Sequence, residues 1–348
     1  MADEKPIREK GADGQDSLFI VGIGASAGGL EALQQFFVRM PENSGISFVV
    51  IQHLSPDYKS LMADILGKHT AMAVLQVENG MEVKPDTVYL IPPKKNMTLK
   101  DGKLILSEIV QGTLNHPIDI FFTSLAAEEK ERGIAVILSG TGTDGTSGIK
   151  AMKEHGGLVL IQNPETAKFD GMPRSAINTG LADFVLSPEE IVEEILNFSH
   201  YPTLIKPQER EVFFSDEQTF PRIYAVLKKV SGIDFTNYKR TTVLRRIERR
   251  MVVTHSTNLA EYVDFLENNE EEASVLVKEI LIGVTNFFRD PAFFEKLKRN
   301  AVYPIVERTG EKEPIRVWSA GCSTGEEAYS LAILFREVMD ELDVQRDI

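Results

Sequence analysis

The chain passes from an apolar run into a glycine-rich turn at Leu18-Phe19-Ile20-Val21-Gly22-Ile23-Gly24-Ala25-Ser26-Ala27-Gly28-Gly29. The run predicts a strand over 18–24, and the apolar spacing after the turn predicts a helix over 30–40. The turn matches G-x-S-x-G, a spacing that places a serine between small neighbours. Free N–H groups at the helix N-terminus could bind an oxyanion there. A dinucleotide loop beginning at Gly22-Ile23-Gly24 is the alternative.

Strand and helix patterns then alternate over the first 200 residues. Further strands are expected at 47–52, 87–91, 103–107, 134–138 and 158–161. Helices are expected at 60–69, 118–129, 147–155 and 189–198. Residues 87–91 and 103–107 flank Lys100-Asp101-Gly102, which predicts that they form an inserted strand pair. The remaining alternation predicts an α/β fold, a doubly wound, mostly parallel sheet with helices on both faces.

Three polar residues follow strands of this predicted sheet. Ser26 and His53 come after the first two strands, and Asp144 comes shortly after 134–138. Since catalytic groups gather at the carboxyl edge of such sheets, the three could form a nucleophile, a base and its orienting acid. Taken singly, each has an ordinary structural explanation: a helix cap, a histidine satisfied near the core, and a turn residue. A dinucleotide site would need an acid at position 52 or 53.

The chain order of this triad is Ser, His, Asp, whereas an α/β-hydrolase has Ser, Asp, His. The later histidines of this half, His155 and His200, fall at a helix end and at the domain border. Neither position favours a catalytic base, so His53 is the histidine we expect to serve.

The motifs of this half resemble the catalytic domain of CheB methylesterases. They are 24–29, Gln52-His53, Pro117-Ile118-Asp119, 139–145 and Gly171-Met172-Pro173. The resemblance implies hydrolysis of glutamate methyl esters on chemoreceptors, with deamidation of some glutamines. It makes Ser26 the nucleophile, His53 the base and Asp144 its acid. The backbone N–H of Thr141 would line the oxyanion hole, at a position where the family often has methionine. Many members carry a receiver domain before the esterase; only a short tail precedes Leu18, so we expect no such control in cis.

The second half begins after a polar stretch at 201–215 and has mainly helical spacing over 216–300. Residues 237–251 carry an apolar helical stripe. Four arginines occupy the other faces: Arg245, Arg246, Arg249 and Arg250. They form either a solvated charged face or a docking surface for an acidic partner. Aromatic residues are not interleaved with them, as a nucleic-acid platform would need.

Residues 285–290 and 317–327 resemble the CheR receptor methyltransferases. The second segment reads as a strand over 315–319, a glycine turn and a helix over 326–339. The resemblance implies an S-adenosylmethionine site with Thr285, Arg289 and Glu327 as contacts, and with Gly283 where the family often has asparagine. Cys322 reads as a small buried residue. We expect a CheB–CheR fusion fragment whose cofactor site is incomplete at residue 348, binding weakly or not at all and transferring no methyl group.

Composition limits the remaining classes of function. The 348 residues carry a net charge of −14 and one cysteine, which predicts a cytoplasmic protein that does not wrap nucleic acid. No apolar run approaches the ~20 residues of a membrane span. The expected parts are a disordered tail (1–16), the esterase (17–200), a linker (201–215), a helical domain (216–300) and a truncated methyltransferase start (301–348). The esterase needs no metal or cofactor, and its partner would be a chemoreceptor-like protein. A catalytically silent scaffold that docks receptor helices is the rival.

Overall fold

The computed structural model describes residues 18–52, 62–109, 114–200, 219–283, 285, 287–308 and 313–348. The expected tail, the linker and His53 lie outside the described residues. The chain forms two compact units, Met1–Leu281 and Ile282–Ile348. The second unit therefore begins before position 301, where the sequence placed the boundary.

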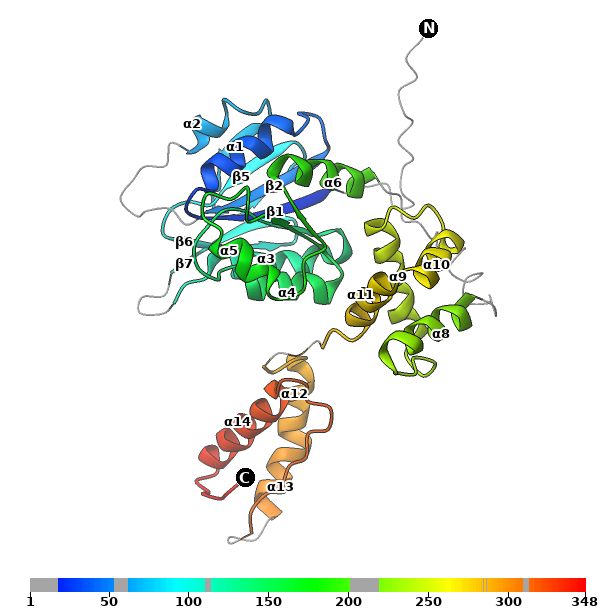
Figure 1. The fold of residues 1–348 in the computed structure, drawn as a ribbon. Helices are drawn as coiled ribbons and strands as arrows, with labels where there is room; N and C mark the ends of the chain where they lie inside the picture. Colours follow the sequence, from blue (N-terminus) through cyan, green and yellow to red (C-terminus); the bar gives the residue numbers. More distant parts are fainter. Residues whose placement is uncertain are drawn as a thin grey trace. The chain divides into compact units, whose positions relative to one another are not determined.

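The first unit contains the expected parallel sheet (Figure 1). Seven strands are ordered β10-β9-β8-β1-β2-β5-β3, and every neighbouring pair is parallel. They are β1 (Phe19–Ala25), β2 (Ile46–Gln52), β3 (Ala73–Gln76), β5 (Thr87–Leu90), β8 (Ile134–Ile137), β9 (Leu158–Gln162) and β10 (Phe184–Leu186). This arrangement confirms the α/β fold class.

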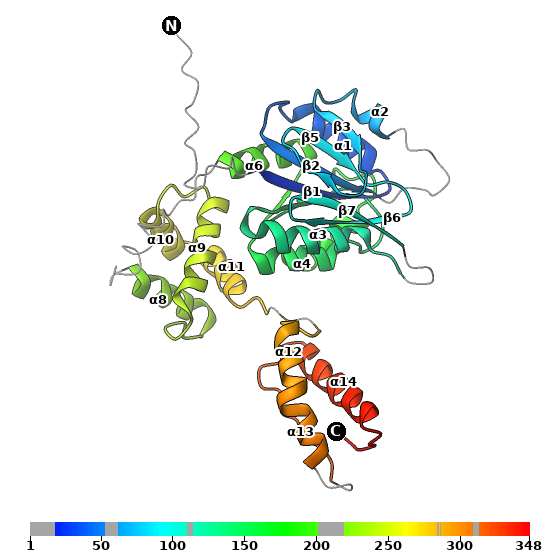
Figure 2. The same cartoon turned by 180° about the vertical axis from the view of Figure 1, so that it is seen from behind.

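Helices cover both faces of this sheet, as Figure 2 shows from behind. One face packs against α1 (Gly29–Arg39), α2 (Met62–Leu66) and α6 (Pro188–His200). The other packs against α3 (Pro117–Glu129), α4 (Thr146–His155) and α5 (Gly171–Ile177). Each face has its own apolar core because side chains alternate along the buried strands.

The glycines at 22 and 24 are explained by the contact between β1 and α3. A Cβ at Gly22 would lie 2.9 Å from the Phe122 ring, and one at Gly24 would lie 2.6 Å from Ile118. These glycines therefore let a helix approach the strand closely, which removes the reason to interpret them as the start of a dinucleotide loop.

The inserted strand pair differs from the prediction. β7 (Lys103–Glu108) pairs antiparallel with β6 (Lys95–Lys100), and β4 (Met81–Glu82) adds to the other side of β7. The turn between β6 and β7 places Asp101 and Gly102 at φ of 49° and 69°, the positive values that a tight hairpin requires. The prediction that 87–91 pairs with 103–107 is wrong, because β5 belongs to the parallel sheet.

Four helices follow among the described residues of the first unit. They are α8 (Thr219–Ser231), α9 (Arg240–Val253), α10 (Leu259–Asn268) and α11 (Glu270–Ile280). They share one apolar core, to which α9 contributes Leu244, Ile247 and Met251 of the predicted stripe. The helical character expected for this region is confirmed.

The second unit is built on α12 (Pro291–Leu297), the π-helical turn Lys298–Val302, α13 (Tyr303–Arg308) and α14 (Glu326–Glu341). Their core includes Val302, Val306, Leu334 and Val338. The predicted strand over 315–319 does not form; the Ile315 N–H donates to the Asp347 carbonyl at 2.9 Å, but no strand lies beside this segment in the described part of the chain. Within that part, no helix is both long and apolar enough to cross a membrane.

Candidate active site and ligand pocket

Three adjacent strands bring Ser26 and the loop that carries Asp144 to one edge of the sheet. β1 lies between β8 and β2, and their register pairs Ala25 with Gln52 and Gly24 with Ile137. Ser26 directly follows β1, and His53 follows Gln52 in the sequence but lies outside the described residues. The 139–145 segment leaves β8 at the same edge, as expected for the carboxyl ends of neighbouring parallel strands.

Ser26 is half-buried and is held by the loop after β8. Its N–H donates to the Ser139 carbonyl at 3.0 Å, and its own carbonyl accepts from Gly29 N at 2.9 Å. A Cβ at Gly140 would overlap Sδ of Met172 and lie 2.9 Å from Cβ of Ser26. Glycine at 140 therefore lets the loop that carries Thr141 lie directly against the serine.

Asp144 is almost fully buried, with 4% of its surface exposed. Its two carboxylate oxygens accept 3.0 Å hydrogen bonds from the N–H groups of Ile118 and Asp119, in the first turn of α3. These two bonds come from the N-terminus of a helix, where backbone N–H groups lack partners within the helix. Asp144 is thus fixed in position, as an orienting acid must be.

Asp119 connects the first turns of α3 and α4. Its Oδ1 accepts from Gly148 N at 2.7 Å. Burial raises the pKa of Asp119, and the nearby charge of Asp144 raises it further. Helix α3 therefore makes two contacts: its N–H groups bind Asp144, and the side chain of its Asp119 binds α4.

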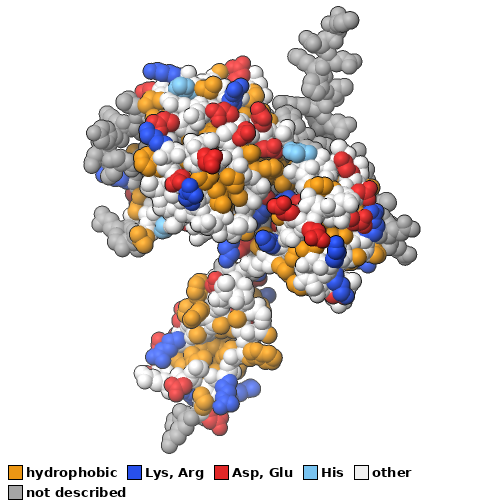
Figure 3. Space-filling model, in the orientation of Figure 1, with side chains coloured by type: hydrophobic (Ala, Val, Ile, Leu, Met, Phe, Trp, Pro, Cys, Tyr) orange, Lys and Arg blue, Asp and Glu red, His pale blue; other side chains and the backbone are white. Residues whose placement is uncertain are grey.

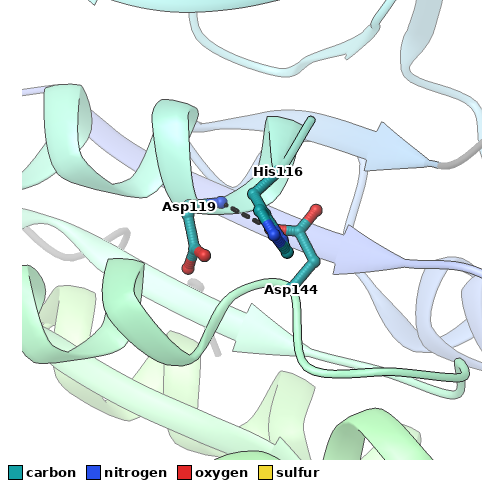
Figure 4. A group of neighbouring side chains, drawn as sticks. All are labelled: His116, Asp119 and Asp144. Atoms are coloured by element: carbon teal, nitrogen blue, oxygen red, sulfur yellow. Dashed lines mark hydrogen bonds and ion pairs between the residues drawn. The ribbon is translucent and has the colours of Figure 1, made fainter. Parts of the chain in front are cut away.

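His116 is a residue of this site that sequence reasoning missed. Its Nδ1 lies 3.7 Å from Oδ1 of Asp144, and 43% of its side chain is exposed. Figure 4 shows His116, Asp119 and Asp144 together. The signal was its place directly before the Pro117-Ile118-Asp119 motif. Ligand atoms of these three lie within 4.8 Å of one another, but both carboxylates already accept backbone N–H groups, so the geometry does not call for a metal.

The basic helix α9 is not the free surface that the sequence suggested. Arg246, Arg249 and Arg250 are buried, and the exposed Arg245 lies 3.6 Å from Glu131. The partners of the buried three belong to the first unit itself: Arg250 pairs with Glu272 at 2.6 Å, and Arg246 and Arg249 bind groups at the end of α4. Helical spacing alone does not tell whether these arginines are exposed to solvent or buried.

The three predicted cofactor contacts line one pocket of the second unit. Thr285, Arg289 and Glu327 share a cavity of about 730 Å³ with aromatic side chains that include Phe293 and Trp318. Glu327 accepts from the Ser319 hydroxyl at 2.7 Å. Large apolar side chains exposed on this unit include Phe293, Ile305, Val317 and Trp318, and hydrophobic groups gather on the face seen in Figure 3. Volume, aromatic walls and a carboxylate suit a nucleoside that bears an amino group.

Two smaller predictions about this pocket had different outcomes. Cys322 is half-buried rather than buried, because it lies on the wall of the open cavity. A Cβ at Gly283 would lie 2.8 Å from Oγ of Ser323. A larger residue at 283 would therefore displace the turn before α14.

Comparison with known sequences identifies the first domain. The family model described as CheB methylesterase matches residues 21–195, half of the chain. The chain belongs to the CheB methylesterase family. After the CheB domain, residues 218–281 match the CheR methyltransferase all-alpha domain and 283–348 match the CheR SAM binding domain. The CheB domain is thus joined to CheR domains in one chain.

Individual proteins are similar to parts of this chain. An uncharacterized 104.1 kDa protein of Rhodobacter capsulatus is 41% identical over 80% of this chain and 32% of its own length. A protein-glutamate methylesterase/protein-glutamine glutaminase of Thermotoga maritima is 35% identical over 51% of this chain and 53% of its own. The crystal structure of the Thermotoga maritima CheB methylesterase catalytic domain is 34% identical, with a TM-score of 0.49, over 52% of this chain and 98% of that structure. The chain therefore spans about a third of the first relative and about half of the second.

Proposed function

We propose that the CheB domain hydrolyses glutamate methyl esters of a chemoreceptor-like protein through Ser26, His53 and Asp144. The observation that carries the proposal is the β8-β1-β2 order, which brings Ser26 and the buried carboxyl group of Asp144 to one sheet edge; in the sequence, His53 follows directly after β2. A serine hydroxyl is too weak an acid to attack unaided, so this edge supplies what a hydrolase needs.

In the proposed reaction the His53 imidazole takes the Ser26 proton as Oγ attacks the ester carbonyl. The new oxyanion is stabilised by the backbone N–H of Thr141 and by the N-terminus of α1. His53 then protonates the departing methanol, which leaves a glutamyl ester on Ser26. Water attacks this ester with His53 again as base, releasing the glutamate. The same steps on glutamine would release ammonia.

For the second unit we propose an S-adenosylmethionine site contributed by Thr285, Arg289 and Glu327. When bound, that cofactor would supply a methyl group for glutamate carboxylates. The chain's own part is to bind and orient: Glu327 offers a carboxylate to an amino group, and Trp318 and Phe293 offer aromatic surface. Such an arrangement would place the addition and the removal of one methyl ester in one protein.

Hydrolysis of a methyl-esterified receptor fragment by the full chain tests the esterase. Ser26→Ala should lower kcat/KM by about 10³-fold or more, because it removes the nucleophile. Ser107→Ala, at an exposed serine on β7, is the matched control and should keep the wild-type rate. A wild-type chain as slow as Ser26→Ala would instead support the rival, a catalytically silent scaffold.

A further inference from the structure

Helix α9 binds the carboxyl end of α4 through two buried arginines. Each guanidinium donates to two carbonyls: Arg246 to those of Lys153 and Glu154 (2.8 and 3.1 Å), and Arg249 to those of Gly156 and Gly157 (3.0 and 2.9 Å). These carbonyls lie in the last turn of α4 and just beyond it, where a helix has unsatisfied acceptors and a partial negative charge. Burial lowers the pKa of Arg246 to about 10, still above neutral pH, so both caps are cationic.

A buried set of charges continues this contact between the CheB and the helical domains. Lys153 of α4 donates to Asp183 at 2.8 Å and to Glu279 of α11 at 2.9 Å. Arg249 pairs with the same two carboxylates, at 2.5 Å to Glu279. Arg250 lies 3.8 Å from Asp183 and 3.5 Å from Glu279. The CheB domain thus supplies one cation and one anion and the helical domain two cations and one anion, and each cation meets the carboxylates of both domains. Burial opposes the charge of Glu279, but Arg249 and Lys153 hold its pKa well below the usual range.

The contact extends along α9 from Arg245 to its end. Arg245 lies 3.6 Å from Glu131, and Val253, the last residue of the helix, is buried in the apolar core that β1 shares with α1 and α6. Just beyond the helix, His255 lies 3.7 Å from Glu194 of α6. A helix with contacts at its middle, at its last residue and just beyond it cannot rotate or slide without breaking several of them together.

The other end of α4 leads to the active site. α4 begins at Thr146, two residues after Asp144, and its Gly148 N–H donates to Asp119, whose own N–H donates to Asp144. A helix of ten residues is a rigid rod about 15 Å long. The arginine caps and Asp144 are therefore at opposite ends of one rod.

We propose that the helical domain positions Asp144 for the esterase reaction, acting through the Arg246 and Arg249 caps on α4. The CheB domain and helices α8–α11 then form one cooperative unit, in which Arg249 is a positioning residue. The basic helix does meet an acidic partner, but that partner is its own chain. The positioning role rests on the proposed esterase function, whereas the single unit does not.

A double-mutant cycle in the full chain tests the single unit. Lys153→Met and Glu279→Gln should each lower the denaturant midpoint strongly, because each leaves a buried group of the other domain poorly paired. The double variant should lose clearly less than the two single losses together, and CheB and helical probes should unfold at one midpoint. Additive losses, or two separate midpoints for the two domains, would overturn the single unit.

Esterase kinetics test the positioning role. Arg249→Lys keeps the charge but loses the planar fork that reaches both carbonyls and carboxylates. We expect kcat to fall about three- to tenfold with KM for a small methyl ester unchanged. The acid limb of kcat should move to lower pH, because a displaced Asp144 stabilises the imidazolium less. Arg246→Lys, which loses only carbonyl bonds, should act in the same direction and serves if Arg249→Lys does not fold.

Tyr262→Phe is the matched control for these kinetics. It removes a buried 2.9 Å hydrogen bond to Glu272 inside the helical domain and leaves the α4 caps intact. It should lower stability but keep the wild-type kcat and pH midpoint. If the wild type is active and both arginine variants have its kcat and its pH midpoint, the positioning role is overturned. An inactive wild type would remove the proposed function and the positioning role together, while the double-mutant cycle would still decide the single unit.

Discussion

The chain contains two junctions of the same local design, and their surroundings differ. In each, an apolar run enters a glycine turn and then a helix: Ser26 precedes α1, and Glu327 lies in the first turn of α14. Both helices begin after a left-handed glycine, Gly28 at φ 72° and Gly325 at φ 103°. The first run is a strand between two neighbours, whereas in the second, Trp318 is 91% exposed. Local sequence specifies the turn, and neighbouring strands decide how firmly it is held.

This difference separates what the two sites can do chemically. The proposed triad needs closely positioned groups, and Ser26 is bonded to the loop after β8 while Asp144 is bonded to the first turn of α3. A pocket with an exposed aromatic wall can bind a ligand but does not fix reacting atoms by itself. We therefore expect substitutions to have larger effects at the first junction than at the second.

The largest effect should come from Asp144→Asn. Asparagine neither stabilises the imidazolium nor selects the correct tautomer of His53, so we expect kcat/KM for the methyl ester to fall by about 10³–10⁴-fold. Asparagine has one acceptor oxygen for the two α3 N–H groups, so the free energy of unfolding should also fall, by about 1–3 kcal/mol. Asp86→Asn is the control, because Asp86 also accepts a backbone N–H, from Gly45 at 2.7 Å, but at the opposite edge of the sheet. A loss of less than tenfold for Asp144→Asn would contradict the triad.

The pH dependence of the same reaction identifies the base. Only neutral imidazole accepts the serine proton, so the wild-type kcat/KM should rise with pH through the histidine pKa, ordinarily ~6.5. In Asp144→Asn the midpoint of this rise should lie at a lower pH than in the wild type, because the imidazolium has lost the carboxylate that stabilised it. A flat wild-type profile between about pH 5 and 8 would argue against a histidine base.

An intermediate effect is expected from placing alanine at the two matched glycines. Both substitutions force a left-handed alanine, which costs about 1 kcal/mol or somewhat more. At Gly28 the new Cβ would also lie 2.7 Å from Oγ of Ser139 and 2.9 Å from Lys168, whereas at Gly325 its nearest neighbour is Tyr329 at 3.5 Å. Gly28→Ala should therefore lower the free energy of unfolding by about 2–4 kcal/mol, and Gly325→Ala by about 1–2.

Denaturant unfolding can follow each unit separately in this comparison. Trp318 is the single tryptophan of the chain and reports on the second unit, while circular dichroism is dominated by the larger first unit. If both substitutions lower the free energy of unfolding equally, the surroundings of the two junctions do not determine how firmly each turn is held, and the comparison fails.

Sequence patterns predicted much of the CheB domain because its strands and helices are strongly periodic. The α/β class, the β1 turn and the place of Asp144 after β8 were all visible as apolar runs followed by polar residues. Four strands of this domain were missed: β3, β4 and β10, with four, two and three residues, are too short to show a period, and β6 (Lys95–Lys100) was missed because the predicted partner of 103–107 was 87–91. β5 was assigned to the wrong sheet because strand pairing depends on residues that are distant in the sequence.

The α9 arginines and the 315–319 segment both show that local sequence does not reveal distant partners. The stripe of Leu244, Ile247 and Met251 correctly predicted a helix, but nothing local says that Arg249 meets Gly156, more than 90 residues away. Residues 315–319 have a strand-like composition, yet a strand exists only beside another strand. In both cases the deciding partner lies far away in the sequence.

The smallest effect should appear at the open junction, in Glu327→Gln. Since Thr285, Arg289 and Glu327 share one pocket, we expect weak S-adenosylmethionine binding rather than none. Trp318 lines the same pocket, so its fluorescence reports binding without any catalytic assay. Glutamine still accepts from the Ser319 hydroxyl but loses the charge that would hold the ligand's amino group, which should raise Kd about tenfold. Glu337→Gln, an exposed change on the same helix 3.8 Å from Lys298, should keep the wild-type Kd. Absence of any ligand-dependent change in Trp318 emission, or equal affinity in the two variants, would count against this pocket as the cofactor site. Neither result would bear on the first junction, because Ser26 and Asp144 lie at the edge of the β-sheet in the other unit.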